Sequence, residues 1–362
     1  MTNPDPTAGM ISRPNPNPIK RILQPLFGYG FAAACLVWVL HDVKPGELWR
    51  VLASVNAWLL LPAVALDVMS YVSQGYRWKL LLHPLGRLST LKSTQAVYAG
   101  LFTNEIVPMR AGELVRAFLV SRWLSVGVVS VIPSMAVERM FDGVWLALGI
   151  GLTALFVRLP GDFLLAADVL AVVVIASLGL FIWMVFRSRN HHAQNQEPAK
   201  SGWKPLRWMT ASIGRIARGI AEIGLSRPFY QSLISSSLIL IFQILAFWLV
   251  MLAYGLHATI WEGAAVLLIV HFGTAIPNAP SNVGSYQFFT VLGLTLFGAD
   301  KTTAAGFSMA VFVILTVPLW AIGFLAVSRT GMTFREIRSA VQKIKIPSHV
   351  SKDKDTMMGL PL

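Results

Sequence analysis

Charged and amide side chains gather in short stretches of an otherwise apolar chain. The first stretch combines an amide, two arginines and a carboxylate: Asn104, Arg110, Glu113 and Arg116. Pro108 within it ends one helical segment, and we expect a new helix to begin near Ala111. The start of a helix presents free N–H groups and a positive dipole end. With arginines beside it, such a start suits an anion such as a phosphate group.

Further along the chain, Glu138, Arg139 and Asp142 lie within a second apolar run. Glu138 and Asp142 are four residues apart and share a helix face, which we expect to meet Arg110 or Arg116. Ionisable groups at membrane depth either mark a transport pathway or pair with one another. Both interpretations stay open here, as does a simple ion pair between Glu113 and Arg116.

A third polar stretch carries no acidic or basic side chain apart from His271 at its start. Its neutral residues surround Pro277 and Pro280, and those of interest are Asn278, Ser281, Asn282, Tyr286 and Gln287. Ser281 or Asn282 can cap a helix that begins after the break. The set suits a hydroxylated or zwitterionic group, or it merely satisfies the backbone of a broken helix.

The composition defines the class of protein that must position these residues. Hydrophobic residues make up 55% of the chain and charged residues 13%, whereas soluble domains average about 25% charged. We therefore predict an all-α polytopic membrane protein, and we attribute the net charge of +13 to basic cytoplasmic flanks rather than to nucleic-acid binding. The single cysteine, Cys35, excludes an intrachain disulfide and a cysteine-cluster metal site. No enzyme motif is present, so we expect no catalysis, metal or cofactor.

Six apolar runs approach or exceed the length of about 20 residues that a crossing needs. They are Ile22–Leu40, Trp58–Gly75, Met135–Val157, Phe163–Phe186, Phe229–Tyr254 and Ala304–Val327. Basic flanks, with Arg77 and Lys79 as interfacial anchors, predict that residues 1–21 and the tail 328–362 are cytoplasmic, in a bacterial cytoplasmic membrane. We expect residues 1–21 to be disordered.

The two remaining apolar segments must each return to the side from which they start. Parity of the flanking crossings places both ends of 91–124 in the cytoplasm and both ends of 261–297 outside. We therefore predict two re-entrant hairpins within inverted repeats, 22–157 and 163–327; the alternative is eight or more simple spans. Paired broken segments of this kind indicate the binding site of a transporter.

The cytoplasmic loop 187–228 holds the longest polar stretch of the chain. Within it, residues 207–225 place isoleucines on one helical face and arginines towards the other. This pattern predicts an amphipathic helix on an anionic lipid surface. Binding of a protein partner or of a second copy of the chain remains an alternative.

Four motifs together resemble the membrane domain of the lysylphosphatidylglycerol synthase/flippase family. They are Gly75-Tyr-Arg-Trp78, the run from Asn104 to Arg116, Glu138-Arg139-x2-Asp142, and Pro277-x2-Pro280-x3-Gly284-x2-Gln287. The resemblance covers nearly all of residues 22–327, although Gln287 stands where members often carry Glu. It implies translocation of a lipid across the bilayer. Only residues 328–362 follow the last span, so we do not expect the family's soluble synthase activity.

These observations lead to one functional hypothesis and two alternatives. The leading hypothesis is a flippase-like transporter of a lipid with a phosphate-bearing or otherwise polar headgroup. In this hypothesis, three arginines hold the headgroup: Arg110, Arg116 and Arg139. Three carboxylates position those arginines: Glu113, Glu138 and Asp142. The alternatives are a membrane enzyme or accessory factor acting on lipid-linked sugar or hopanoid, and a scaffold that recruits a partner through the cytoplasmic loop.

Overall fold

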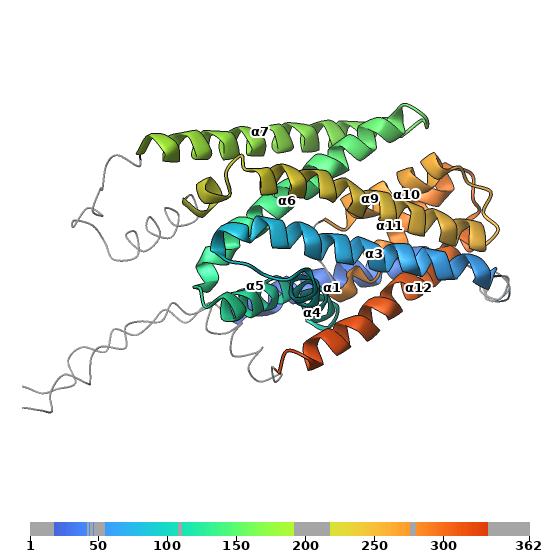
Figure 1. The fold of residues 1–362 in the computed structure, drawn as a ribbon. Helices are drawn as coiled ribbons and strands as arrows, with labels where there is room; N and C mark the ends of the chain where they lie inside the picture. Colours follow the sequence, from blue (N-terminus) through green and yellow to red (C-terminus); the bar gives the residue numbers. More distant parts are fainter. Residues whose placement is uncertain are drawn as a thin grey trace, which may run out of the picture.

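The computed structural model describes residues 18–41, 43, 46, 55–107, 111–191, 218–275 and 280–331, and every regular element in these ranges is helical (Figure 1). The N-terminal residues 1–17 and most of the tail, 332–362, lie outside these ranges. So do Arg110, Asn278 and the greater part of the predicted amphipathic helix, residues 207–217.

The order of long and short helices is the same in the two halves of the chain. The first half contains α1 (Pro18–Leu40), α3 (Ala57–Leu81), the short turn η1 (His83–Leu85), α4 (Thr90–Ile106), α5 (Ala111–Leu124) and α6 (Val128–Ala154). The second half contains α7 (Gly161–His191), α9 (Arg227–Ala253), α10 (Ile260–Gly273), the short turn η2 (Pro280–Asn282), α11 (Ser285–Leu296) and α12 (Lys301–Ser328). Each half therefore has two long helices, a short pair and a final long helix.

All six predicted apolar runs form helices, which confirms a helical membrane protein. By length and composition, four segments of the described ranges can cross a membrane: Ala57–Leu81, Gly161–Arg187, Arg227–Ala253 and Lys301–Ser328. The helix α6 is 27 residues long but contains the charged residues Glu138, Arg139 and Asp142. In α1, the apolar part belongs to a shorter segment, Tyr29–Leu40.

The short helices pack against each other as two hairpins. The first pair, α4 and α5, has 17 and 14 residues, and the second pair, α10 and α11, has 14 and 12. At 1.5 Å per residue, these helices are about 18–26 Å long. Each is shorter than the hydrocarbon core of a bilayer, which is about 30 Å thick.

Polar caps start most of the described helices. The side chain of Ser89 accepts a hydrogen bond from the N–H of Lys92 at the start of α4, and Thr259 forms a capping box with Glu262 at the start of α10. The side chain of Asp300 accepts a hydrogen bond from the N–H of Thr303 at the start of α12. Hydrogen bonds from Thr303 lower the pKa of the Asp300 carboxyl. The caps explain why these helices begin where the apolar runs do.

The two halves interlock through equivalent contacts. The second long helices, α3 and α9, pack along each other and form the most extensive helix contact in the described part of the chain. The first hairpin helix of each half packs against the last helix of the other half: α4 against α12, and α10 against α6. In Figure 1, α3 and α9 run side by side through the middle, while α7 lies at one edge beside α6.

Two glycines bring the helices of the first hairpin into backbone contact. A Cβ atom on Gly100 would lie 2.8 Å from the carbonyl oxygen of Gly112, and one on Gly112 would overlap the carbonyl oxygen of Gly100. Small residues at such positions let helices approach closely in a membrane. The hairpin geometry therefore depends on the absence of a side chain at residues 100 and 112.

We expect Gly112→Ala to lower the unfolding midpoint of the purified protein in detergent. The added methyl group must push α4 and α5 apart, and overpacking of this kind costs about 1–3 kcal/mol. The matched control is Gly179→Ala in α7, where a Cβ meets nothing within 4 Å. Circular dichroism on heating measures both; equal midpoints for the two variants would contradict the close packing of the hairpin.

Candidate functional site

A cluster of charged side chains joins three helices of the first half. Glu138 of α6 lies between two arginines, Arg77 of α3 and Arg116 of α5, and all three are buried. Arg77 Nη2 donates to Glu138 Oε1 at 2.7 Å. Arg116 donates to both oxygens of the same carboxylate, through Nη1 to Oε1 at 3.2 Å and through Nη2 to Oε2. One carboxylate thus bonds to two buried guanidinium groups.

Neighbouring groups hold the two arginines in place. Arg77 Nη1 also donates to Asp142 Oδ1 at 2.5 Å, and the backbone carbonyl of Arg77 accepts a bond from the hydroxyl of Ser232 in α9. The guanidinium of Arg116 lies 4.2 Å from the centre of the Trp78 ring, whose Nε1 donates to Ser134. The cluster is therefore fixed by α3, α5, α6 and α9 together.

The outer part of the cluster is accessible. Arg139 donates to Glu113 at 2.7 Å and to Asp142 at 3.1 Å, and the side chains of these three residues are 50%, 31% and 38% exposed. Across the cluster, three arginines face three carboxylates, so their formal charges cancel. Within the part of the chain that the structure describes, the Nε atoms of Arg77 and Arg116 have no hydrogen-bond partner.

The structure brings together five residues that the sequence proposed as one site. They are Glu113, Arg116, Glu138, Arg139 and Asp142. The face shared by Glu138 and Asp142 meets Arg116, as expected, whereas Glu113 pairs with Arg139 of α6 rather than with Arg116. Arg77 belongs to the cluster too, and its placement as an interfacial anchor is wrong because its side chain is buried.

Asn104 has a different role from the one that the sequence suggested. The new helix begins at Ala111, as predicted, but the Oδ1 atom of Asn104 accepts a hydrogen bond from the N–H of Gly112 at 2.8 Å. The amide of α4 therefore caps α5 across the hairpin. One of the N–H groups that were expected to face an anion is already satisfied from within the protein.

The second hairpin also satisfies its own broken backbone. Gln287 Oε1 accepts a hydrogen bond from the N–H of Gly284 at 2.7 Å, so Gln287 caps α11. The prediction that Ser281 or Asn282 provides this cap is wrong. These two residues adopt left-handed conformations, with φ of 57° and 51°, and the hydroxyl of Ser281 donates to the backbone carbonyl of Glu105 at 3.2 Å. That bond joins the second hairpin to the end of α4.

A polar cavity of 210 Å³ lies where the hairpins meet. It is lined by residues of α3, α4, α9, α10, η2, α11 and α12. The polar members of the lining are Asp67, Tyr71, Glu105, Gln243, His271, Thr274, Ser281, Asn282, Tyr286 and Thr316. Among the described residues, this lining contains two carboxylates and no lysine or arginine. The cavity therefore differs in charge from the balanced cluster around Glu138.

Sequence analysis missed several of these residues, including Asp67 and Gln243. Asp67 is the only charged residue in the apolar run 58–75. An ionisable residue alone in a membrane span is a recognised signal of function, and it could have identified Asp67. No comparable pattern singles out Gln243, because its position depends on how α9 packs against α3.

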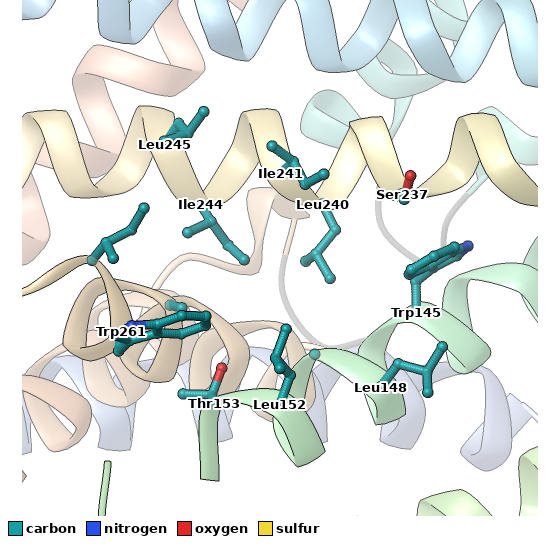
Figure 2. A pocket seen from close by; sticks show the side chains of 13 residues that line it. Trp145, Leu148, Leu152, Thr153, Ser237, Leu240, Ile241, Ile244, Leu245 and Trp261 are labelled. Atoms are coloured by element: carbon teal, nitrogen blue, oxygen red, sulfur yellow. The ribbon is translucent and has the colours of Figure 1, made fainter. Parts of the chain in front are cut away.

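A separate apolar groove of 290 Å³ lies between α6, α9 and α10 (Figure 2). Leu148 and Leu152 of α6 face Leu240 and Ile244 of α9 across it, and Trp261 of α10 closes one end. Leu148 and Leu152 are about half exposed. The groove is thus open towards the surroundings of the helices and offers them an almost wholly apolar surface.

Part of the predicted amphipathic helix lies within the described residues. Residues 218–223 are helical, and Ile220 and Ile223 are buried in the core of the first half. This end of the apolar face therefore packs on protein rather than on lipid. The predicted contact with an anionic lipid surface stays a prediction for residues 207–217, which lie outside the described ranges.

The fold and the site define a multi-pass helical membrane protein in which two helical hairpins meet at a polar cavity. The family model described as the lysylphosphatidylglycerol synthase TM region matches residues 25–323, and the chain belongs to this family. The recognition made from the sequence motifs is thereby confirmed.

Two curated relatives are similar to the chain over different lengths. The UPF0104 membrane protein MJ1595 of Methanocaldococcus jannaschii is 23% identical over 328 residues, which cover 83% of this chain and 92% of the relative. The glycosyltransferase AglD of Haloferax volcanii is 33% identical over 101 residues, or 28% of this chain. The matched part is only 16% of the length of AglD.

We expect Glu138→Gln to destabilise the protein by about 3–5 kcal/mol, because it leaves two buried arginines without their shared carboxylate. The control is Glu113→Gln, which removes the partner of the half-exposed Arg139 and should cost about 0–1 kcal/mol. Chemical unfolding in detergent micelles measures both free energies. A loss for Glu138→Gln no larger than for Glu113→Gln would show that the buried pairs do not hold the helices together.

Proposed function

We propose that this protein moves a lipid with a polar headgroup, phosphate-bearing or otherwise, between the two leaflets of a membrane. The observation that carries the proposal is the polar cavity at the junction of two hairpins, surrounded by apolar helices. A lipid in transit needs a hydrophilic path for its headgroup while its acyl chains stay in an apolar environment. This cavity supplies the first requirement.

The proposed topology is an inverted repeat with two re-entrant hairpins. It is supported by the equal order of helices in the two halves, by helices in both hairpins that are shorter than a bilayer core, and by the equivalent contacts α4–α12 and α10–α6. An odd number of crossings per half inverts the second copy relative to the first. Both termini would then lie in the cytoplasm, in a bacterial cytoplasmic membrane.

In this proposal the charged cluster has an inner and an outer role. The buried residues Arg77, Arg116 and Glu138 fix the helices, because Asp142 completes the compensation of their charges. The exposed pair of Arg139 and Glu113 can exchange partners with a headgroup at little cost, since exposed ion pairs contribute about 0–1 kcal/mol. We assign to Arg139 the first contact with an anionic headgroup.

The apolar groove of Figure 2 is the proposed path for an acyl chain. It opens on the side of the protein formed by α6 and α9, the helices that also contribute to the charged cluster and to the polar cavity. A lipid could therefore keep its tail against the groove while its headgroup moves between the two polar regions.

A second candidate function is an enzyme acting on a lipid-linked sugar. The observation that favours it is the partial similarity to AglD, which is named a glycosyltransferase. Asp67, Glu105 and His271 line one cavity and could exchange protons with a bound substrate. This candidate predicts a new covalent product when the purified protein meets a lipid-linked sugar, whereas a transporter returns its lipid unchanged.

The proposed topology predicts which cysteines a membrane-impermeant reagent can reach. On a Cys35→Ser background, Lys92→Cys and Ser125→Cys at the two ends of the first hairpin should label only from the cytoplasmic side. His257→Cys and Leu296→Cys beside the second hairpin should label only from outside. These positions are exposed in the structure. Labelling of the two ends of one hairpin from opposite sides would replace it with a single crossing.

For the proposed transport, we expect Arg139→Ala to slow the movement of a fluorescent anionic phospholipid in proteoliposomes by at least about tenfold, equivalent to about 1.4 kcal/mol. Quenching of the outer leaflet measures the rate. The control is Arg158→Ala, at an exposed residue between α6 and α7. Equal rates for Arg139→Ala and the unaltered protein would reject the assigned contact, and no protein-dependent lipid movement at all would reject transport of the lipid tested.

A further inference from the structure

The carboxyl group of Asp67 is buried without a complete set of partners. Asp67 is 5% exposed and lies about 15 Å along α3 from its first residue, since each residue adds 1.5 Å. Its Oδ2 atom is buried and has no hydrogen-bond partner among the described residues. Ser70, one turn along α3, donates to the backbone carbonyl of Asp67 rather than to its carboxyl group. The side chain instead lines the polar cavity.

No basic side chain of the described residues compensates this group. Arg77, Arg116 and Arg139 form ion pairs with Glu113, Glu138 and Asp142, and no ion pair among the described residues includes Asp67. The titratable groups that face Asp67 from its own helix and from α4, α10 and α11 are Tyr71, Tyr98, Glu105, His271 and Tyr286. In the cavity lining, α9 contributes the neutral Gln243, and α12 adds Thr316 with apolar residues.

An ionised carboxylate in this setting is costly. Burial of an isolated charge is unfavourable by many kcal/mol, so such groups take up a proton or acquire a positive partner. The described residues contain no group of three histidine, cysteine or acidic side chains that could hold a metal ion. A proton needs only one carboxylate, and the cavity of 210 Å³ is large enough to admit water, which can deliver it.

We propose that Asp67 is the proton-binding site of this protein, and that it is protonated while the cavity is closed. The inference rests on the proposed transport of lipid, to which it adds the coupling ion. A hydronium ion donates the proton to the carboxylate oxygen and leaves as water, and the neutral carboxyl group returns the proton to a water molecule when the cavity opens. No bond other than O–H forms or breaks in this step.

Among the described residues, two hydrogen bonds of Glu105 join the first hairpin to η2 and α12 beside the cavity. Ser281 donates to the backbone carbonyl of Glu105, and Trp320 of α12 donates to the Glu105 carboxylate at 3.2 Å. Separation of the two hairpins would exchange these hydrogen bonds for bonds to water. Asp67 then meets water on one side of the membrane, and its protonation follows the pH of that side.

Infrared difference spectroscopy on the full chain in liposomes tests the proton site directly. Between acidic and alkaline buffer, the unaltered protein should lose a carboxylic-acid C=O band that Asp67→Asn lacks. Glu105→Gln and the control Asp162→Asn, at the exposed start of α7, should keep that band. The proposal is overturned if Asp67→Asn keeps the band unchanged. It is also overturned if, at constant pH, the band of the unaltered protein changes when sodium replaces choline in the buffer.

A transport measurement then links the site to lipid movement. For the unaltered protein, we expect a transmembrane pH gradient to change the rate of lipid transfer. In Asp67→Asn, the rates with and without the gradient should be equal. The two proposals can fail separately. An Asp67 band without any lipid movement supports the proton site and rejects transport, while lipid movement without an Asp67 band rejects only the proton site.

Discussion

Glu138 is the group on which the arrangement of the first half depends. Its carboxylate binds Arg77 of α3 and Arg116 of α5, so three helices share one buried interaction. Desolvation of each of these charges costs several kcal/mol, and the groups are tolerated only together. Because α5 is fixed in this way, the backbone contact between Gly100 and Gly112 also fixes α4 and the end of the first hairpin.

The end of that hairpin meets the second one under a constraint set by the membrane. Broken helices leave N–H and C=O groups that lipid cannot satisfy, so protein or enclosed water must do so. Asn104 and Gln287 satisfy N–H groups at the starts of α5 and α11, and Ser281 bonds to Glu105 between the hairpins. Their polarity therefore serves the backbone first. What remains for a ligand is the cavity lining, with Asp67 as its buried carboxylate.

Much of this organisation could be predicted from local patterns. The apolar runs predicted six helices, and Pro108 predicted the interruption after which α5 begins at Ala111. The spacing of Glu138 and Asp142 predicted a shared face that meets Arg110 or Arg116, and in the structure Glu138 bonds to Arg116. Arg77 was misplaced because a basic residue near the end of an apolar run usually lies at the interface. Its burial depends on Glu138, which lies 61 residues further along the chain.

The sequence by itself determined the class of protein, the helices and their breaks, since hydropathy, proline and capping act within a few residues. Only the tertiary structure decided which polar groups face each other. Helix packing, which no local pattern encodes, places three ionisable groups at one cavity: Asp67 of α3, Glu105 of α4 and His271 of α10. The balance of the charged cluster was decided in the same way, because an arginine either binds a ligand or compensates a carboxylate according to what lies beside it.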